Sequence, residues 1–387
     1  MMDYRPVIII IKAAFGMDVG NIDTNFAVEQ CLAIAKSQQL EVLLITGMRK
    51  LGIPYTPEMR QIVLRSAMVS NLQTNVAEKL YALFESHQID YMPLKGCELK
   101  SLYPSAEMRS MGDIDVLIRK EKYKKYIHPV LLAEGFKECY ESDHEYVWDK
   151  DGVHIELHKR LIPSYNKDYY AYYGDGWQLA KPTDKPYRYA MSHEDTFVFI
   201  FTHYAKHYRD VGAGIRQALD LYVYRKAYPQ MDEQYIQQTL IQLQLERFYA
   251  NTMHMLDVWF GNAEHTEASQ LISDHLFASG AFGTRENSLQ SAMLKQVNHQ
   301  GSVEKARLAK WLHRIFLPLD SMRRLYPILH KFPFLLPFLW VPRWIRILLH
   351  KRYRFEEYRQ EDSTLDETTV ESYRENLQKA GLDFNFK

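Results

Sequence analysis

The chain has 387 residues, enough for more than one domain, and its 47% hydrophobic and 25% charged residues exclude a disordered or fibrous protein. Lys plus Arg equals Asp plus Glu at 48 each, so the net charge gives no general argument for nucleic acid binding. Cys31, Cys97 and Cys139 form no CxxC pair, which argues against a disulfide framework and favours a reducing cytoplasm.

A helical region is predicted at the N-terminus, over residues 1–88. The apolar run from Val7 to Ile11 stops at Lys12, which is short for the core of a signal peptide, and we assign it to a buried helix or strand. From residue 24 to 90, apolar residues recur with the spacing of amphipathic helices. We therefore expect four or five helices in this region.

A compact α/β unit is predicted over residues 89–162. The apolar runs "IDYMP" and "DIDVLI" indicate strands, and "CELKSLYP" between them predicts a short helix that ends before Pro104. A further helix is predicted in "KEKYKKYIHPVLLAEGF", kinked or shortened by Pro129. The alternating runs of "EYVWDKDGVHIELHK" flank an Asp-Gly turn and predict a β-hairpin. The expected fold class is α+β, with a small mixed sheet between helical regions.

Helices are expected again in the second half of the chain. Residues 163–300 contain amphipathic segments, one of which begins with Ser192 and Asp195 as an imperfect capping box. Within this region, residues 278–293 are the expected loop or linker. The last region, residues 301–387, combines a basic, aromatic helical segment with an acidic tail.

Two aspartates stand out in the predicted strand "DIDVLI". Asp113 and Asp115 flank Ile114, and because side chains alternate along a strand they point the same way, with Cα atoms ~6.8 Å apart. Two carboxylates so placed repel each other, and burying them unpaired is costly. Either they lie at an exposed strand start and pair with Arg109 or Arg119, or divalent cations such as Mg²⁺ lie between them.

A third acid, Glu156, lies on a predicted strand of the same sheet, and neighbouring strands are ~4.8 Å apart. Asp113, Asp115 and Glu156 would then hold two ions ~3.5–4 Å apart, as in sites for in-line phosphoryl and nucleotidyl displacement. The turn at Lys95 and Gly96 favours this interpretation. Gly96 allows close backbone approach to a phosphate, and Lys95 would neutralise its charge.

Together, "YMPLKGCELKSLYP", "RSMGDIDVLI" and "VHIELHKRL" resemble the uncharacterised bacterial nucleotidyltransferases of the NTP-transferase 5 type, within the DNA polymerase β-like nucleotidyltransferase superfamily. The resemblance extends from about residue 24 to about residue 350 and includes "HYAKHYRDVGAGIRQALDLYVY" and "FPFLLPFLWVPRWIRIL". It implies metal binding by Asp113 and Asp115, with Glu156 as the third acid. It also implies that Lys95 and Gly96 contact the triphosphate.

The function that we expect is transfer of a nucleoside monophosphate from an NTP to a hydroxyl of a protein or small-molecule acceptor. Pyrophosphate would be released, and two Mg²⁺ ions would be required. No basic-aromatic motif favours nucleic acid as a partner. Two alternatives remain: a catalytically silent nucleotide-binding or interaction protein, and a membrane-peripheral protein of surface-polysaccharide synthesis.

The histidines of "HIELH" suggest a rival metal site. His154, Glu156 and His158 share one face of a strand and are plausible zinc or iron ligands. Three ligands along one straight strand span ~13 Å, however, which is too far for one ion. A dedicated transition-metal site is therefore not the favoured interpretation.

A second group of polar residues follows on the next predicted helices. His203 and His207 are one helical turn apart, and Arg216 and Asp220 repeat that spacing. One interpretation is an interhelical polar cluster with an Arg216–Asp220 ion pair. The other is that His203, His207 or Arg216 lines the site and binds the substrate or its phosphates, for which a guanidinium is well suited.

The segment from residue 305 to 354 has twelve Lys or Arg and one acid, and eight acids follow in the 20 residues from Glu356. Its "FPFLLPFLWVP" is too short and too rich in proline to span a membrane, which takes ~20 apolar residues. It would either lie on a membrane surface, anchored by Trp340 and Trp344, or pack on the helical region with the acidic tail neutralising it. The expected location is the cytoplasm, with the inner membrane face as a further site in the first case.

Overall fold

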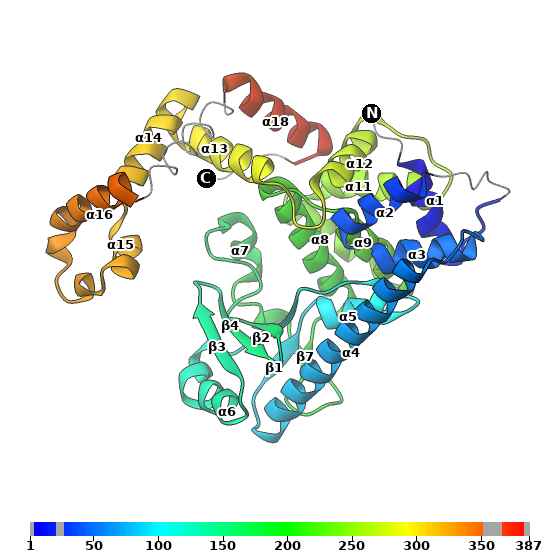
Figure 1. The fold of residues 1–387 in the computed structure, drawn as a ribbon, viewed down its shortest axis with the longest axis horizontal. Coiled ribbons are helices and arrows are strands. Elements are labelled where there is room, and N and C mark those ends of the chain that lie inside the picture. The colour runs from blue at the N-terminus through cyan, green and yellow to red at the C-terminus, as the bar shows by residue number, and fades with distance from the viewer. Residues whose placement is uncertain (1–3, 21–26, 351–365, 383–387) are drawn as a thin grey trace. The chain divides into compact units, whose positions relative to one another are not determined.

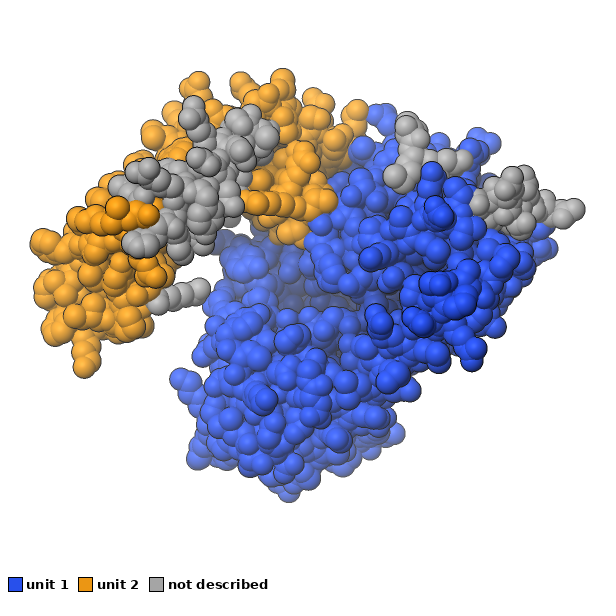
Figure 2. Space-filling view, viewed as in Figure 1, with its two compact units in different colours: residues 1–208, 212–283, 380–382 blue, residues 209–211, 284–379, 383–387 orange. Residues whose placement is uncertain are grey.

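The computed structural model describes residues 4–20, 27–350 and 366–382. Two compact units divide the chain (Figure 2). Unit 1 comprises residues 1–208, 212–283 and 380–382, and unit 2 comprises residues 209–211, 284–379 and 383–387. Unit 1 contains the sheets, whereas the described part of unit 2 is helical (Figure 1).

Four helices make up the described N-terminal part of unit 1, in agreement with the prediction. They are α1 (Arg5–Ala14), α2 (Val28–Gln38), α3 (Glu41–Lys50) and α4 (Pro57–Ser86). The apolar run predicted to be buried lies in α1, where Ile10 and Ile11 are fully inaccessible. Helix α3 packs against α1 so closely that a Cβ atom on Gly47 would lie 2.0 Å from the carbonyl oxygen of Ile10. Only glycine allows this contact.

The main sheet of unit 1 has five strands in the order β1-β2-β5-β4-β3. The strands are β1 (Tyr91–Pro93), β2 (Asp113–Ile118), β3 (Lys137–Glu141), β4 (Glu145–Lys150) and β5 (Val153–His158). Strands β2 and β5 pair in parallel, and the other neighbours pair antiparallel. The sheet is therefore mixed, and the predicted α+β class with helical flanks is confirmed.

The predicted hairpin forms between β4 and β5. Asp151 and Gly152 have φ values of 56° and 81°, as the favoured two-residue hairpin turn requires. This turn fixes the register from the Lys150–Val153 pair to the Glu145–His158 pair. The edge strand β3 was not predicted, because all its residues are exposed and it shows no alternation of apolar and polar residues.

One face of this sheet is covered by the hydrophobic core. Ile114, Val116 and Ile118 of β2 belong to the core cluster, to which α4 contributes Leu80 and Phe84. Figure 1 shows α4 running along the sheet. Since neighbouring side chains on a strand point to opposite faces, the aspartates of β2 lie on the other face.

The segment between β2 and β3 differs from the single helix that was predicted. It consists of η2 (Lys120–Lys122), the π-helical η3 (Tyr123–Ile127) and α6 (His128–Ala133). Pro129 lies in the first turn of α6, where its missing N–H costs no helical hydrogen bond. The chain therefore starts a new helix at this proline. Between β1 and β2, α5 (Gly96–Lys100) is the predicted short helix, followed by η1 (Ala106–Met108).

The remainder of unit 1 is mainly helical. Its elements are α7 (Lys167–Tyr173), η4 (Trp177–Leu179), the paired strands β6 (Lys181–Pro182) and β7 (Tyr189–Ala190), α8 (His193–Asp210), α9 (Ile215–Ala227), α10 (Glu233–Gln242), α11 (Glu246–Phe260) and α12 (Glu267–Ser279). Ser192 caps α8 as predicted. Its hydroxyl accepts a hydrogen bond from the Asp195 amide at 3.1 Å and donates one to the Asp195 carboxylate at 2.7 Å.

Unit 2 begins where the linker was predicted, but the linker is shorter. Its helical elements are α13 (Arg285–Gln300), α14 (Val303–Ile315), α15 (Leu319–Leu325), η5 (Pro327–His330), η6 (Pro333–Leu335), α16 (Leu336–His350) and α18 (Glu367–Ala380). Thr284 accepts a hydrogen bond from the Asn287 amide at 3.1 Å and starts α13, so the prediction of a loop to residue 293 is wrong. Residues 351–365, which join the basic segment to the acidic tail, lie outside the described residues. No helix in the described ranges is long and apolar enough to cross a membrane.

Candidate active site

One cavity of unit 1, about 430 Å³ in volume, brings together every residue that the sequence singled out for the site. Its walls come from β2, β5, the turn before α5, α8 and α9. The singled-out residues in its lining are Lys95, Gly96, Asp113, Asp115, Glu156, His203, His207 and Arg216. Segments that are more than 100 residues apart in the chain thus share one polar cavity.

The parallel pairing of β2 and β5 explains how the three acids meet. Asp115 lies directly opposite Glu156 in the register, and Asp113 lies opposite His154. The two aspartates are half-buried, while Ile114 between them is fully buried in the core. One face of the sheet therefore carries the core, and the other carries the carboxylates.

Neither aspartate forms the surface ion pair that the simpler interpretation requires. Arg119 donates to Asp90 at 2.8 Å, and Arg109 donates to Asp220 at 2.7 Å. The interpretation that Asp113 and Asp115 merely neutralise these arginines is therefore wrong.

The carboxylates alter one another's protonation. Burial, together with the charges of Asp113 and Asp115, raises the pKa of Glu156 to about 9. Burial and the charge of Asp115 also raise the pKa of Asp113. Burial alone would raise the pKa of Asp115, but a hydrogen bond from His158 and the charge of Lys95 hold it below its ordinary value. A cation in this cluster would offset the repulsion that keeps Glu156 protonated.

His158, which the sequence analysis considered only as part of the rival zinc or iron set, lies beside the acids of the site. Its Nε2 lies 2.7 Å from Oδ1 of Asp115 and 3.5 Å from Oε2 of Glu156. One ligand atom from each of these three residues falls within 4.8 Å of the others, close enough to share one metal ion. The rival set of His154, Glu156 and His158 does not assemble, because the His154 side chain is 63% exposed and lies outside the cavity lining.

Two further residues that were missed are Glu145, the first residue of β4, and His144, which directly precedes it. Glu145 pairs with His158 in the sheet register, and His144 Nε2 lies 2.9 Å from the Glu145 carboxylate. His144, Glu145 and His158 form a second group with ligand atoms within 4.8 Å of one another. The hairpin turn contained the signal for this position, since a two-residue loop at residues 151 and 152 places Glu145 opposite His158.

The Lys95–Gly96 turn lies in the same cavity lining. Lys95 has φ 26° and ψ −80°, an unfavourable backbone conformation for a residue with a side chain. Its Nζ lies 4.9 Å from the centroid of the Phe199 ring. Burial lowers the pKa of Lys95, and the charges of Asp115 and Asp113 oppose that shift. A Cβ atom at Gly96 would lie 2.6 Å from Sδ of Met111, so the turn is closely packed.

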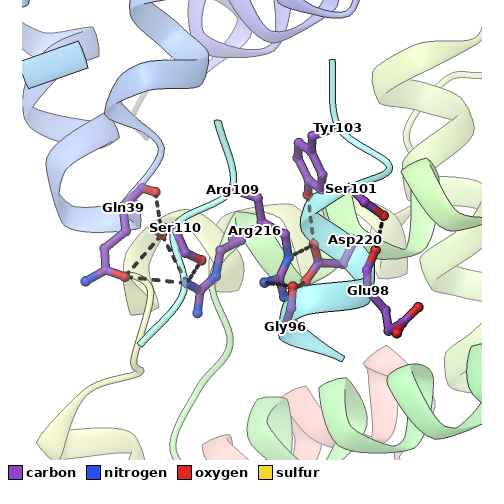
Figure 3. A network of polar contacts seen from close by, with 9 residues as sticks. All are labelled: Gln39, Gly96, Glu98, Ser101, Tyr103, Arg109, Ser110, Arg216 and Asp220. Carbon is purple, nitrogen blue, oxygen red and sulfur yellow. Dashed lines mark hydrogen bonds and ion pairs between the residues drawn. The ribbon is translucent and has the colours of Figure 1, made fainter. Parts of the chain in front are cut away.

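A buried network connects this turn to α9 (Figure 3). Nε and Nη2 of Arg109 donate to the two carboxylate oxygens of Asp220 at 2.7 and 2.8 Å, and the Tyr103 hydroxyl donates to the same carboxylate at 2.9 Å. Nη1 of Arg109 reaches the Gly96 carbonyl at 3.4 Å. Asp220 is thus paired with Arg109, and the interpretation that includes an ion pair between Asp220 and Arg216 is wrong.

Arg216 makes a different set of contacts, on the left of Figure 3. Its Nη1 donates to the carbonyl and hydroxyl oxygens of Ser110 at 2.8 and 3.1 Å and approaches the Gln39 side chain at 3.5 Å. Its buried Nε has no hydrogen-bond partner among the described residues. The guanidinium is therefore held in the lining of the cavity, and its Nε can still donate a hydrogen bond.

His203 and His207 form a pair on α8, with their Nε2 atoms 3.2 Å apart. Burial, followed by the charges of Lys95 and His207, lowers the pKa of His203 well below its ordinary value. His203 is therefore neutral at physiological pH and can both donate and accept a hydrogen bond. Both histidines line the cavity, as the functional interpretation required.

Comparison with known proteins gives one match. Residues 24–261 match the family described as uncharacterised nucleotidyltransferase. Neither the curated proteins nor the solved structures contain a match to the chain. The family match includes β1 to β5 and helices α8 and α9, and hence all the strands and helices that form the cavity walls. It covers more than half of the chain, and the protein therefore belongs to this nucleotidyltransferase family.

Proposed function

We propose that the protein transfers a nucleoside monophosphate from an NTP to a hydroxyl group of an acceptor and releases pyrophosphate. Membership of the family supports a general role in nucleotidyl transfer. The observation that carries the proposal is the assembly of Asp113, Asp115 and Glu156 in the lining of the cavity that also contains Lys95 and Gly96.

The acids of this cavity suit a divalent metal. Carboxylate oxygens are the protein ligands that Mg²⁺ prefers, and burial together with the charges of Asp113 and Asp115 raises the pKa of Glu156. Asp113, Asp115 and Glu156 would hold the metal, while His158 would orient Asp115 through their 2.7 Å hydrogen bond. When bound, Mg²⁺ neutralises phosphate charge during the displacement.

The positively charged side chains of the cavity suit the negatively charged triphosphate. Lys95 would bind phosphate oxygens through its ammonium group, and the Gly96 backbone, which lines the same cavity, would lie close to a phosphate. Arg216 is held at Nη1 by Ser110, and its Nε is available for a further hydrogen bond. His203, as a neutral donor and acceptor, would contact the nucleotide or the acceptor together with His207.

The chemistry requires removal of one proton. The acceptor oxygen forms a bond to the α-phosphorus as the bond between that phosphorus and the oxygen bridging to the β-phosphate breaks, so that pyrophosphate leaves. Glu156, in its carboxylate form, would take the proton from the acceptor hydroxyl. The carboxylates of Asp113 and Asp115 are held in place and would provide a preorganised electrostatic environment around the reacting phosphate.

Transfer of label from NTPs labelled at the α-phosphate tests this proposal. The full-length protein, Mg²⁺ and cell extract should give a labelled acceptor, and the Asp113→Ala, Asp115→Ala double variant should not. His154→Ala is a matched control, because His154 lies on β5 next to the site but is exposed and outside the cavity lining. This control should retain full transfer.

The possible results lead to different conclusions. Transfer at the normal level by the double aspartate variant would overturn the assigned site. If the normal protein binds Mg-NTP tightly but transfers no label with any NTP, the enzymatic proposal fails and a catalytically silent nucleotide-binding protein is supported instead.

A further inference from the structure

Unit 2 exposes a continuous apolar stripe on α16. The side chains of Phe338, Val341, Ile345 and Leu349 are 71%, 47%, 52% and 70% exposed, and Phe334 in η6 is 69% exposed. These residues recur at intervals of three or four, so they lie along a single face of the helix. Monomeric soluble proteins rarely expose such a contiguous apolar surface without a partner.

Another side of α16 contacts α14, which leaves this stripe exposed. The indole Nε1 atoms of Trp340 and Trp344 donate to the carbonyls of Leu317 and Ile315 at 3.0 and 2.8 Å. Arg343 donates to the Ile315 carbonyl at 3.1 Å. The two tryptophans, suggested as membrane anchors from the sequence, thus attach α16 to the end of α14. The residues left to contact a partner are the aliphatic and phenylalanine side chains of the stripe.

Other elements of unit 2 also expose apolar side chains. Leu308 and Leu312 of α14 are 61% and 48% exposed and one helical turn apart. Between α15 and η6, Ile328 and Phe332 are 49% and 45% exposed. We call the α16 stripe, with Phe334 of η6, the apolar face of unit 2.

Positive charge accompanies this face. From residue 305 to 350 the sequence has nine Lys or Arg and one acid, Asp320. Lys305, Lys331 and Arg346 are exposed, and Arg346 directly follows Ile345 of the stripe. A second copy of the chain would bring one basic segment against another, and like charges repel. An anionic lipid surface complements both the charge and the apolar side chains.

We propose that the apolar face of unit 2 docks on an anionic membrane surface. Phe338 and its neighbours on α16 enter the boundary between headgroups and acyl chains, and Lys331 and Arg346 contact lipid phosphates. This attachment is interfacial, in keeping with the absence of a membrane-spanning helix from the described residues. It does not depend on the proposed nucleotidyl transfer, so each proposal can fail without the other.

Vesicle flotation with the full-length protein tests the proposal. The protein should float with phosphatidylcholine vesicles that contain about 30% phosphatidylglycerol, and much less with phosphatidylcholine alone. Phe338→Ser with Ile345→Ser should lower partitioning at least about tenfold, since two apolar side chains no longer leave water. Lys331→Glu with Arg346→Glu should lower it on anionic vesicles, most at low salt.

A matched control comes from α4 of unit 1. Leu64 and Met68 are also exposed, by 56% and 73%, and are one helical turn apart. Leu64→Ser with Met68→Ser should float normally, which would tie the effect to the apolar face of unit 2.

Three results would overturn the proposal. The first is equal flotation with neutral and anionic vesicles. The second is normal flotation of the Phe338, Ile345 double variant on anionic vesicles. The third is a dimer in light scattering that this double variant converts to a monomer while vesicles bind neither form, which would assign the apolar face to a second copy of the chain.

Discussion

The cavity of unit 1 and the apolar face of unit 2 depart from ordinary burial in opposite directions. In the cavity, carboxylates are withdrawn from water beside one another, and the pKa of Glu156 rises to about 9. On the apolar face, Phe338 and Leu349 stay about 70% exposed. Each arrangement is unfavourable by itself, and the proposed ligand, a cation in one case and a lipid surface in the other, would offset it. In both regions, the departure from the usual burial of apolar side chains and exposure of charged ones indicates the candidate functional site.

Replacing Glu156 should have the largest effect and tests the cavity side of this comparison. Glu156→Gln should lower the rate of label transfer by roughly 10²- to 10⁴-fold, because the variant has neither the metal ligand nor the proton acceptor. The fold should persist, since glutamine keeps the shape and is neutral, as the protonated Glu156 is. Initial rates and thermal unfolding measure the two effects. Glu121→Gln, at an exposed acid of η2, is the control and should leave both unchanged; an equal loss of rate in both variants would contradict the assignment.

The next effect concerns stability and the network behind the site. Asp220→Asn should lower the free energy of unfolding by ~3–5 kcal/mol, because it leaves the buried guanidinium of Arg109 without its counter-charge. Asp90→Asn breaks the more exposed pair with Arg119 and should cost only ~0–1 kcal/mol. Urea unfolding of both variants gives the comparison. Similar losses would mean that burial of the Arg109–Asp220 pair does not matter.

The sequence was sufficient to predict the elements with strong local signals. The Asp-Gly turn identified the β4–β5 hairpin, and alternation around Ile114 placed Asp113 and Asp115 on one face. The parallel register of β2 with β5, which sets Asp115 opposite Glu156, is a tertiary pairing that no local pattern encodes.

The predictions that failed depended on contacts between distant segments. Asp220 is one turn from Arg216 on α9, and local spacing suggested their ion pair as one of two interpretations. Arg109, more than 100 residues earlier, binds the Asp220 carboxylate with two hydrogen bonds instead. His158 was considered only within a disfavoured rival metal set, since its hydrogen bond to Asp115 joins β5 to β2 and no local pattern reveals it. Strand β3 is exposed throughout, so hydrophobic patterning could not reveal it.

The pH dependence of stability provides a test of intermediate size. The pKa of Glu156 rises from 4.5 in the unfolded reference to about 9 in the fold. Its contribution to stability is therefore complete below the lower value and is lost as the pH rises through the higher one. The metal-free protein should unfold at a lower temperature at about pH 9 than at about pH 5, and Mg²⁺ should restore more stability at the higher pH. Glu156→Gln should flatten this dependence; an unchanged slope in that variant would assign it to other groups.

The smallest effect is expected on the apolar face and completes the comparison. Phe338→Ser should change the free energy of unfolding of the lipid-free protein by no more than ~0.5 kcal/mol, because a side chain that is 71% exposed contributes little to the folded state. Leu329→Ala, at a fully buried residue of the same unit, should cost ~2–5 kcal/mol. Urea unfolding of unit 2, followed by tryptophan fluorescence, measures both, since Trp340 and Trp344 contact the end of α14. A loss in Phe338→Ser as large as that in Leu329→Ala would show that this side chain is buried in the lipid-free protein. The stripe would then belong to the interior of the fold and could not dock on a membrane. The cavity of unit 1 would remain as the candidate ligand site.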